Sequence, residues 1–219
     1  MAKIKPLLTI LLVGLIAAVA AVLVTSSWDF SAERIAANER ARLIESLSSV
    51  LEPGLLELDL DPVLLSVTDE ALLGTDRPVD VFVPVDGTTP LAAIFASVAP
   101  HGYNAPINLL IGISIATSRV TGVRVVSHRE TPGLGDLIDI GKSNWILQFD
   151  GKGFDDPPAA DWAVRQDDGA FDAITGATVT PRAVIEAVHD TLLYFEAHRE
   201  ELIAAARAAA ASRSAPVSE

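Results

Sequence analysis

An apolar run near the N-terminus is the feature that most constrains what this chain can fold into. Residues 7–24 carry no charged side chain and one polar residue, Thr9. An α-helix over this run is about 27 Å long at about 1.5 Å per residue, which is close to the hydrocarbon core of a bilayer at about 30 Å. Trp28 follows, where an aromatic side chain suits the membrane interface. The sequence therefore predicts one membrane anchor helix within residues 1–27.

A cleaved signal peptide is the alternative for this segment. Its apolar region normally spans about 7–15 residues and ends in a small-x-small cleavage site, whereas this run is longer and continues as VTSSWDF. Lys3 and Lys5 precede the run, and these nearest charges favour a cytoplasmic N-terminus with the bulk of the chain outside. The wider count does not decide the orientation, because Arg34, Arg40 and Arg42 follow. We expect an uncleaved single-pass anchor.

Composition excludes several classes of function. The chain has no cysteine, which rules out a disulfide, a thiolate nucleophile, a lipoprotein anchor and a Cys-ligated iron–sulfur cluster. An organic cofactor is then needed for any electron chemistry. A net charge of −13 argues against nucleic acid as a partner, because a basic footprint for phosphates is missing. The four histidines show no metal-ligand spacing, so we predict no metal site.

The segment after the anchor, residues 28–77, is predicted to link the anchor to a folded domain. Between residues 31 and 51 the apolar side chains recur at helical spacing, which indicates an amphipathic helix that ends at Pro53 and Gly54. Residues 55–77 are rich in Leu and Asp, and we expect an irregular connection with one short helix there.

Residues 78–200 carry the signals of an α+β domain. Strands are predicted at residues 79–83, 91–98, 108–116 and 121–126, and the short turns between them favour antiparallel pairing. Residues 145–149 and 162–165 are candidates for edge strands. Thr180 and Pro181 have the residue types that begin a helix, and an apolar face follows them. The Ala-rich residues 201–219 are expected to prolong this helix and then to become disordered.

The sharpest local feature is the turn at residues 172–178, which reads DAITGAT and lies just before the predicted helix. Gly176 permits backbone conformations that other residues avoid, and Ala177 leaves the flank of Thr178 open. A phosphate on Thr178 would face the free N–H groups of the helix start, and Arg182 lies one turn further on. These residues therefore describe either a phosphate site or an ordinary capped turn, and the physical features alone favour the turn.

The pattern Asp-x-x-(Ser/Thr)-Gly-Ala-Thr resembles the flavinylation motif of the FMN-binding domain family, in which the last Thr carries FMN through a phosphoester bond. The match at residues 172–178 is complete. A second segment, SHRETPGLGD at residues 127–136, resembles the glycine-rich loop of the RnfG family, the G subunits of the Rnf electron transport complex. Residues 102–103, 109–113 and 145–149 are also similar to that family. Departures are confined to residues 104–106 and Leu137.

The resemblance implies an FMN attached covalently to Thr178. It also implies that a separate flavin transferase reads a recognition motif, and that a glycine-rich loop and an aromatic residue lie against the isoalloxazine ring. The recognition motif comprises Asp172, Thr175, Gly176 and Ala177, with Thr180 and Arg182 at the helix start. The expected ring contacts are Glu130, Thr131, Gly133, Leu134, Gly135 and Trp145, although a purely structural turn explains this loop equally well.

By the same resemblance, the protein is expected to be an electron carrier of a bacterial inner membrane, with its main domain in the periplasm. Its partners would be the other subunits of an Rnf complex that exchanges electrons between ferredoxin and NAD and translocates ions. Such a subunit carries electrons and is not an enzyme alone. Three alternatives stay open: the C subunit of a sodium-translocating NADH:quinone reductase, a stand-alone periplasmic flavoprotein, and a flavin-free membrane-anchored binding or assembly domain.

Overall fold

The computed structural model describes residue 14 and residues 45–51, 53–55 and 62–214. All of the predicted anchor helix except residue 14, most of the predicted amphipathic helix and the last five residues lie outside these ranges. Within the described ranges, no helix combines the length and the apolar character needed to cross a bilayer. The chain divides into two compact units, residues 1–46 and 47–219, and the elements below belong to the second.

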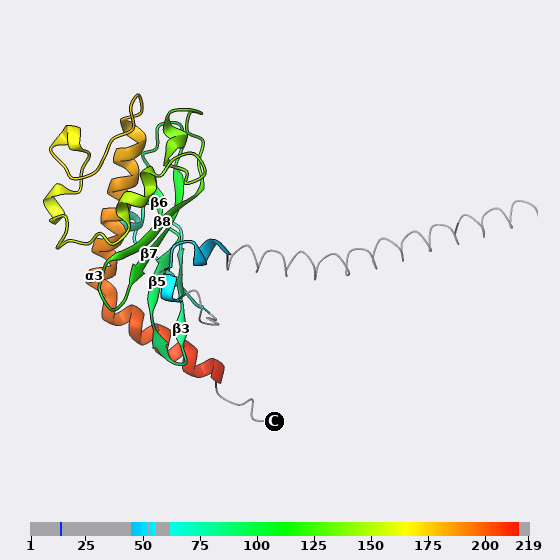
Figure 1. Ribbon diagram of the computed structural model, residues 1–219. Coiled ribbons are helices and arrows are strands. Elements are labelled where there is room, and N and C mark those ends of the chain that lie inside the picture. Colours follow the sequence, from blue (N-terminus) through cyan, green and yellow to red (C-terminus); the bar gives the residue numbers. More distant parts are fainter. Residues whose placement is uncertain (1–13, 15–44, 52, 56–61, 215–219) are drawn as a thin grey trace, which may run out of the picture. The chain divides into compact units, whose positions relative to one another are not determined.

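An antiparallel sheet forms the centre of this unit, as predicted (Figure 1). Strands β1, β2, β5 and β7 pair in that order, and both β6 and β8 also pair with β7. The bounds are β1 Val63–Val67, β2 Val79–Val83, β5 Ala92–Phe95, β6 Val98–Ala99, β7 Ile107–Ser114 and β8 Val120–Ser127. A short hairpin, β3 Val85–Asp86 and β4 Thr89–Pro90, turns at Gly87, whose φ is 60°.

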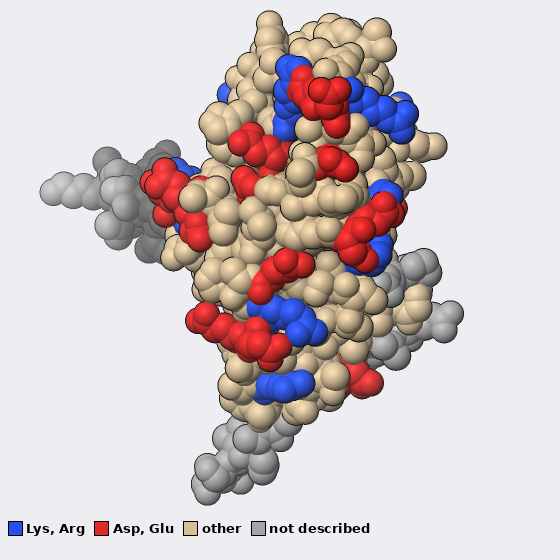
Figure 2. Space-filling model, turned by 90° about the vertical axis from the view of Figure 1, so that its left-hand side faces the viewer, with Lys and Arg blue, Asp and Glu red and all other residues tan. Residues whose placement is uncertain are grey.

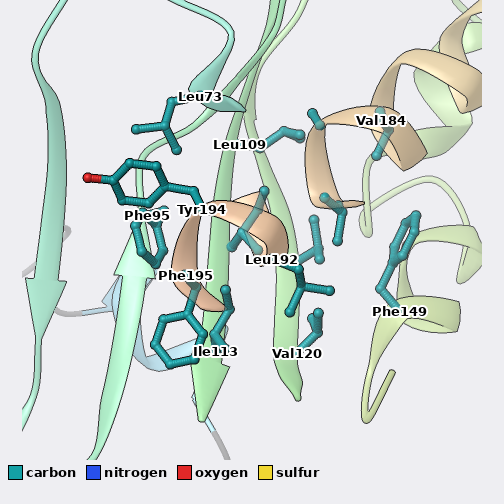
Figure 3. Packing of buried hydrophobic residues seen from close by; sticks show 14 of the residues in the cluster. Leu73, Phe95, Leu109, Ile113, Val120, Phe149, Val184, Leu192, Tyr194 and Phe195 are labelled. Carbon is teal, nitrogen blue, oxygen red and sulfur yellow. The ribbon is translucent and has the colours of Figure 1, made fainter. Parts of the chain in front are cut away.

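One face of the sheet is covered by the long helix α3, Val179–Ser214 (Figure 1). Figure 3 shows Phe95 and Ile113 of the sheet lying close to Leu192, Tyr194 and Phe195 of the helix. The Phe95 ring meets Tyr194 and Phe195 edge-on, with centroid separations of 5.9 and 6.5 Å. This packing explains the alternation along β2, where every second residue is buried. The helix is continuous across residue 200 and buries Leu202, Ile203, Ala206 and Ala210 beyond it.

The other face of the sheet receives the segment at residues 47–51. Leu47 and Val50 are buried there against Ile94 and Leu110. Two glycines that face each other across β7 and β8, Gly112 and Gly122, make room for this segment. A Cβ atom on Gly112 would lie 2.5 Å from the Val50 carbonyl oxygen, and the Thr121 hydroxyl donates a hydrogen bond to that same oxygen.

We expect Gly112→Ala to destabilise the protein by about 1–3 kcal/mol, because the added methyl group has to displace the Val50 backbone or the Thr121 hydroxyl. Urea denaturation measures the effect. Gly141→Ala is the matched control, since a Cβ there meets only Asp139, at 3.4 Å or more. Equal stability of the two variants would contradict a tight fit of residues 47–51 against the sheet.

Residues 128–178 form an irregular arm between β8 and α3, and here two strand predictions were wrong. Residues 145–149, predicted as an edge strand, form the 3₁₀ helix η3 (Trp145–Phe149). Residues 162–165 contribute one isolated bridge, Val164 to Phe171, between the 3₁₀ helices η4 (Ala159–Asp161) and η5 (Arg165–Asp167). A further 3₁₀ helix, η2, spans Gly135–Ile138. The arm is held by an aromatic cluster comprising Trp145, Phe149, Phe154, Trp162 and Phe171.

Other predicted elements are confirmed with shifted bounds. The strand predicted at residues 91–98 is interrupted: β5 ends at Phe95 and β6 begins at Val98. Ser97, buried between them, accepts a hydrogen bond from Thr191 of α3. Strand β1 was missed, and the short helix expected before residue 77 is α2, Glu70–Leu73. The long helix begins at Val179, so Thr180 lies inside its first turn and is not its cap.

Candidate functional site

A pocket of ≈ 350 Å³ opens where the loop after β6, the glycine-rich loop of the arm and the start of α3 meet. This volume falls within the range of about 300–1,000 Å³ that is typical of small-molecule sites. Segments far apart in sequence therefore share one site. The lining residues are Tyr103, Glu130, Thr131, Leu134, Gly135, Gly176, Ala177, Thr178, Val179 and Thr180.

The turn before α3 brings Thr178 to this pocket. The Ala177 amide donates to the Ile174 carbonyl at 3.1 Å, and Gly176 has a φ of 83°, a conformation that side chains with a Cβ rarely adopt. A Cβ on Gly176 would also come within 3.0 Å of Leu134 in the opposite loop. Thr178 directly precedes the first helical residue, so its hydroxyl lies at the positive end of α3.

Glu130 connects the three segments that line the pocket. Its side chain is buried, and Oε1 accepts a hydrogen bond from the Asn104 amide at 3.1 Å. Oε2 accepts a hydrogen bond from the Thr180 hydroxyl in the first turn of α3. Gly135 lies against this carboxylate: a Cβ there would be 2.8 Å from Oε2 and 2.9 Å from the Thr180 hydroxyl. The close approach explains why the loop has glycine at this position.

Exposed apolar side chains surround the pocket. Tyr103 is 67% exposed, and Leu134 and Val179 are about two-fifths exposed, although each is large enough to be costly to leave in water. Tyr103 and Val179 were not among the predicted site residues. The signal that could have found Tyr103 is an aromatic residue between Gly102 and Asn104, a segment too polar to bury it.

Five predicted site residues lie outside the pocket lining: Trp145, Asp172, Gly133, Thr175 and Arg182. Trp145 and Asp172 support the turn instead. The indole Nε1 of Trp145 donates to the Asp172 carbonyl at 2.7 Å, and the Asp172 amide donates to Gln148 Oε1 at 2.7 Å. The Asp172 carboxylate lies 3.2 Å from Arg165. Trp145 is therefore positioned to hold the start of the motif, and its ring is engaged with Phe149 at a centroid separation of 5.6 Å. Gly133 is also outside the lining and has a φ of 77°.

Arg182 is likewise not a lining residue, because Asp167 holds its guanidinium. Nε and Nη2 donate to the two carboxylate oxygens of Asp167 at 2.6 and 2.7 Å. The hydrogen bonds from Arg182 hold the pKa of the Asp167 carboxyl below its ordinary value. Figure 2 shows acidic and basic side chains side by side over one face of the molecule, so the acidic excess does not gather into one patch there.

The Asp167–Arg182 pair predicts a small dependence of stability on pH. A carboxyl whose pKa is lowered on folding stabilises the protein above its unfolded pKa, and that contribution is lost as the pH falls through the folded pKa. Wild type should therefore exceed Asp167→Asn in thermal stability at neutral pH, and the difference should vanish in acid. Asp168→Asn is the matched control, because it leaves the Arg182 pair intact. A difference that persists unchanged in acid would contradict this origin.

A second cavity, of ≈ 490 Å³, lies between α2, the segment after β6 and α3. It is larger than the first but contains none of the predicted site residues. Its lining includes three carboxylates, Glu70, Glu186 and Asp190, whereas the first pocket has one, Glu130, so the second cavity would repel a phosphate more strongly. We therefore assign the candidate site to the smaller pocket, where a hydroxyl and a helix N-terminus meet exposed apolar surfaces.

These residues fit a flavin mononucleotide. The start of α3 offers free N–H groups to a phosphate, and Tyr103, Leu134 and Val179 offer apolar surfaces to a flat ring system. The glycines at positions 135 and 176 allow the two loops to approach each other closely. The lining residues include no His or Lys that could act as a base for chemistry on the Thr178 hydroxyl.

Comparisons with known proteins point the same way. The FMN-binding domain family matches residues 102–193, which include every lining residue of the pocket. The G subunit of the ion-translocating oxidoreductase complex of Pseudomonas aeruginosa (strain UCBPP-PA14) is 46% identical over 201 residues, which cover 91% of this chain and 92% of that protein. The protein of the same name from Cereibacter sphaeroides (strain ATCC 17029 / ATH 2.4.9) is 39% identical over 202 residues, covering 92% and 90%.

A third protein of that name, from Shewanella loihica, is 38% identical over 192 residues, covering 88% of this chain and 90% of its own. Among solved structures, "Crystal structure of Shewanella oneidensis NqrC" aligns with a TM-score of 0.45 at 20% identity, covering 73% of this chain and 74% of that one. The structural similarity is too distant to support a functional argument, whereas the sequence relatives match nearly end to end.

Proposed function

The chain belongs to the family of G subunits of ion-translocating oxidoreductase complexes and carries an FMN-binding domain, and from this premise we propose that it relays electrons through an FMN bound covalently to Thr178. The observation that carries the proposal is the position of Thr178. Thr178 lines the pocket of ≈ 350 Å³, directly precedes α3 and occupies the last position of a complete attachment motif.

The phosphoester would be supported by the first turn of α3. Thr178 would supply the ester oxygen, and the free N–H groups and the dipole of the turn would stabilise the phosphate. Tyr103, Leu134 and Val179 would hold the apolar part of the cofactor and shield it from water. When bound, FMN supplies the one- or two-electron chemistry, and the protein supplies its position and surroundings.

Attachment would require a second protein. A threonine hydroxyl is a weak nucleophile that needs a base, and the pocket lining offers no His or Lys, while its one carboxylate, Glu130, already accepts hydrogen bonds from Asn104 and Thr180. We propose that a flavin transferase reads the motif at Asp172, Thr175, Gly176 and Ala177. The ion pair of Asp172 with Arg165 and the hydrogen bonds with Gln148 and Trp145 would keep the motif in shape before the transfer. Arg182 would reach the phosphate only by leaving Asp167.

The proposed cellular setting rests on the sequence and on the relatives. We propose that residues 7–24 anchor the protein in the inner membrane, with the FMN domain on the periplasmic side. The curated relatives are named as subunits of an ion-translocating oxidoreductase complex, so the other subunits of such a complex are the proposed electron donor and acceptor.

Co-expression of the full chain with a flavin transferase tests the proposal. Denatured protein should show flavin fluorescence at the mass of the chain, and intact mass should rise by one FMN less one water. Expression without the transferase is the control and should give neither signal. Absence of both signals in the presence of a transferase that is active on another substrate would refute the proposed function.

A further inference from the structure

The pocket contains a buried negative charge that the attachment of a cofactor does not require. Glu130 is 5% exposed and lines the pocket. Both of its carboxylate oxygens accept hydrogen bonds, one from the Asn104 amide and one from the Thr180 hydroxyl. Both oxygens therefore face donor groups, which is the hydrogen-bonding arrangement that suits a carboxylate.

In the described part of the chain, the groups that donate hydrogen bonds to this carboxylate are neutral. Among the described residues, no Lys or Arg forms an ion pair with Glu130, in contrast to Asp155, Asp167 and Asp172, which each pair with an arginine. The compensation comes from two neutral donors and from the N-terminus of α3. The charge of Glu130 is therefore not offset by a paired cation in the described part of the chain, and an occupant of the pocket would experience it.

We propose that Glu130 is the positioning residue of this site and that its charge lowers the midpoint potential of the flavin. The inference rests on the proposed function, because it concerns the same pocket. Glu130 holds the loop with Tyr103, the loop with Leu134 and the first turn of α3 in one arrangement, through bonds that span 26 and 50 residues. It thus fixes the walls of the pocket and places a charge among them.

The effect on the potential follows from electrostatics. Reduction adds negative charge to the ring, and a nearby carboxylate opposes that addition. A pocket of ≈ 350 Å³ keeps its occupant within a distance on the order of 10 Å of Glu130. At that distance and an effective dielectric constant of about 20, the carboxylate disfavours the reduced form about tenfold. For a one-electron step, a tenfold change corresponds to about 59 mV.

Two variants, Glu130→Gln and Thr180→Val, distinguish the effect of the Glu130 charge from the effect of its hydrogen bonds on the structure of the pocket. The glutamine removes the charge and keeps the shape of the side chain. The valine removes one hydrogen bond to the carboxylate and leaves the charge in place. Thr180→Val loosens the junction of the three segments and should lower the unfolding temperature of the flavin-free protein, whereas Glu130→Gln can keep both hydrogen bonds, because its amide group can donate to the Thr180 hydroxyl oxygen. The expected loss is that of one buried hydrogen bond, since one partner remains unsatisfied.

The test is a redox titration of the flavin-loaded full chain, with a chemical reductant supplying the electrons. We expect Glu130→Gln to make the midpoint potential of the flavin more positive. At a fixed applied potential, the ratio of reduced to oxidised flavin should rise about tenfold. Thr180→Val should leave the potential unchanged or make it more negative, because the carboxylate loses a donor that offsets its charge.

An equal positive shift in both variants, or none in Glu130→Gln, would overturn the inference. Should Glu130→Gln fail to fold, a positive shift in Thr180→Val alone overturns it, and an unchanged or more negative potential supports it. Intact mass distinguishes this failure from that of the proposed function. A wild type without the FMN adduct refutes the proposed function, whereas a loaded protein with an insensitive potential refutes only the role of Glu130.

Discussion

Thr178→Ala is expected to abolish covalent flavin attachment completely. The substitution removes the one hydroxyl that lies in the pocket directly before α3, and the phosphoester has no other oxygen at this position. Flavin fluorescence of the denatured protein should fall to background, and intact mass should equal that of the unmodified chain. Thr178→Ser keeps a hydroxyl in the same place and is the matched control, so it should still carry a detectable adduct.

A loss of fold would not explain that result. As the residue that precedes α3, Thr178 contributes at most a helix cap, and replacing a capping Thr by Ala costs about 1 kcal/mol. The variant should therefore unfold only slightly earlier than wild type in urea. An adduct that persists in Thr178→Ala would show that FMN is attached elsewhere and would reduce Thr178 to a capping residue.

Of the substitutions considered, Phe149→Ala should lower the free energy of unfolding the most. The ring is fully buried in the arm, with centroids 5.0 Å from Phe171 and 6.4 Å from Trp162. Truncating such a side chain costs about 3–5 kcal/mol, a large share of the roughly 5–15 kcal/mol that stabilises a typical domain. Urea denaturation followed by tryptophan fluorescence measures the loss, because Trp145 and Trp162 belong to the same cluster.

The same substitution should also reduce flavin loading. Phe149 packs against Trp145, whose indole donates to the carbonyl of Asp172 at the start of the attachment motif. Val126→Ala is the control, since Val126 is 61% exposed and its truncation should change stability by less than about 0.5 kcal/mol. Similar unfolding midpoints for the two variants would contradict a supporting role for the aromatic cluster.

Where a pattern extends over several residues, the sequence predicted the fold well. Strand β2 lies at the predicted residues because Val79, Val81 and Val83 alternate with less buried positions. Four of the five residues 145–149 are also apolar, but the buried side chains are Ile146 and Phe149, three residues apart, which suits a 3₁₀ helix. Five residues are too few to separate the two periods. Strand β1 was missed because its own residues are mostly half-exposed and α2 separates it from its partner β2.

In the candidate site, too, the local features were predictable from the sequence and the long-range contacts were not. Thr178 and its neighbours form a local turn before a helix, and a local motif is visible in the sequence. The resemblance to a family led us to expect that Glu130, Leu134 and Gly135 lie beside this turn, and the structure brings them together in one pocket. Arg182 and Trp145 lie outside it because each binds a distant partner, Asp167 or Asp172. Such long-range pairings leave no periodic signal in the sequence.

Peptide mapping of the wild-type protein, matured with a flavin transferase, tests the central claim most directly. Trypsin releases residues 166–182 as one peptide, which contains Thr175, Thr178 and Thr180. Fragmentation of this peptide in the mass spectrometer should place a mass of one FMN less one water on Thr178. An adduct on Thr175 or Thr180, or a peptide that is wholly unmodified, would contradict the assignment of Thr178 as the site at which this chain holds its electron carrier.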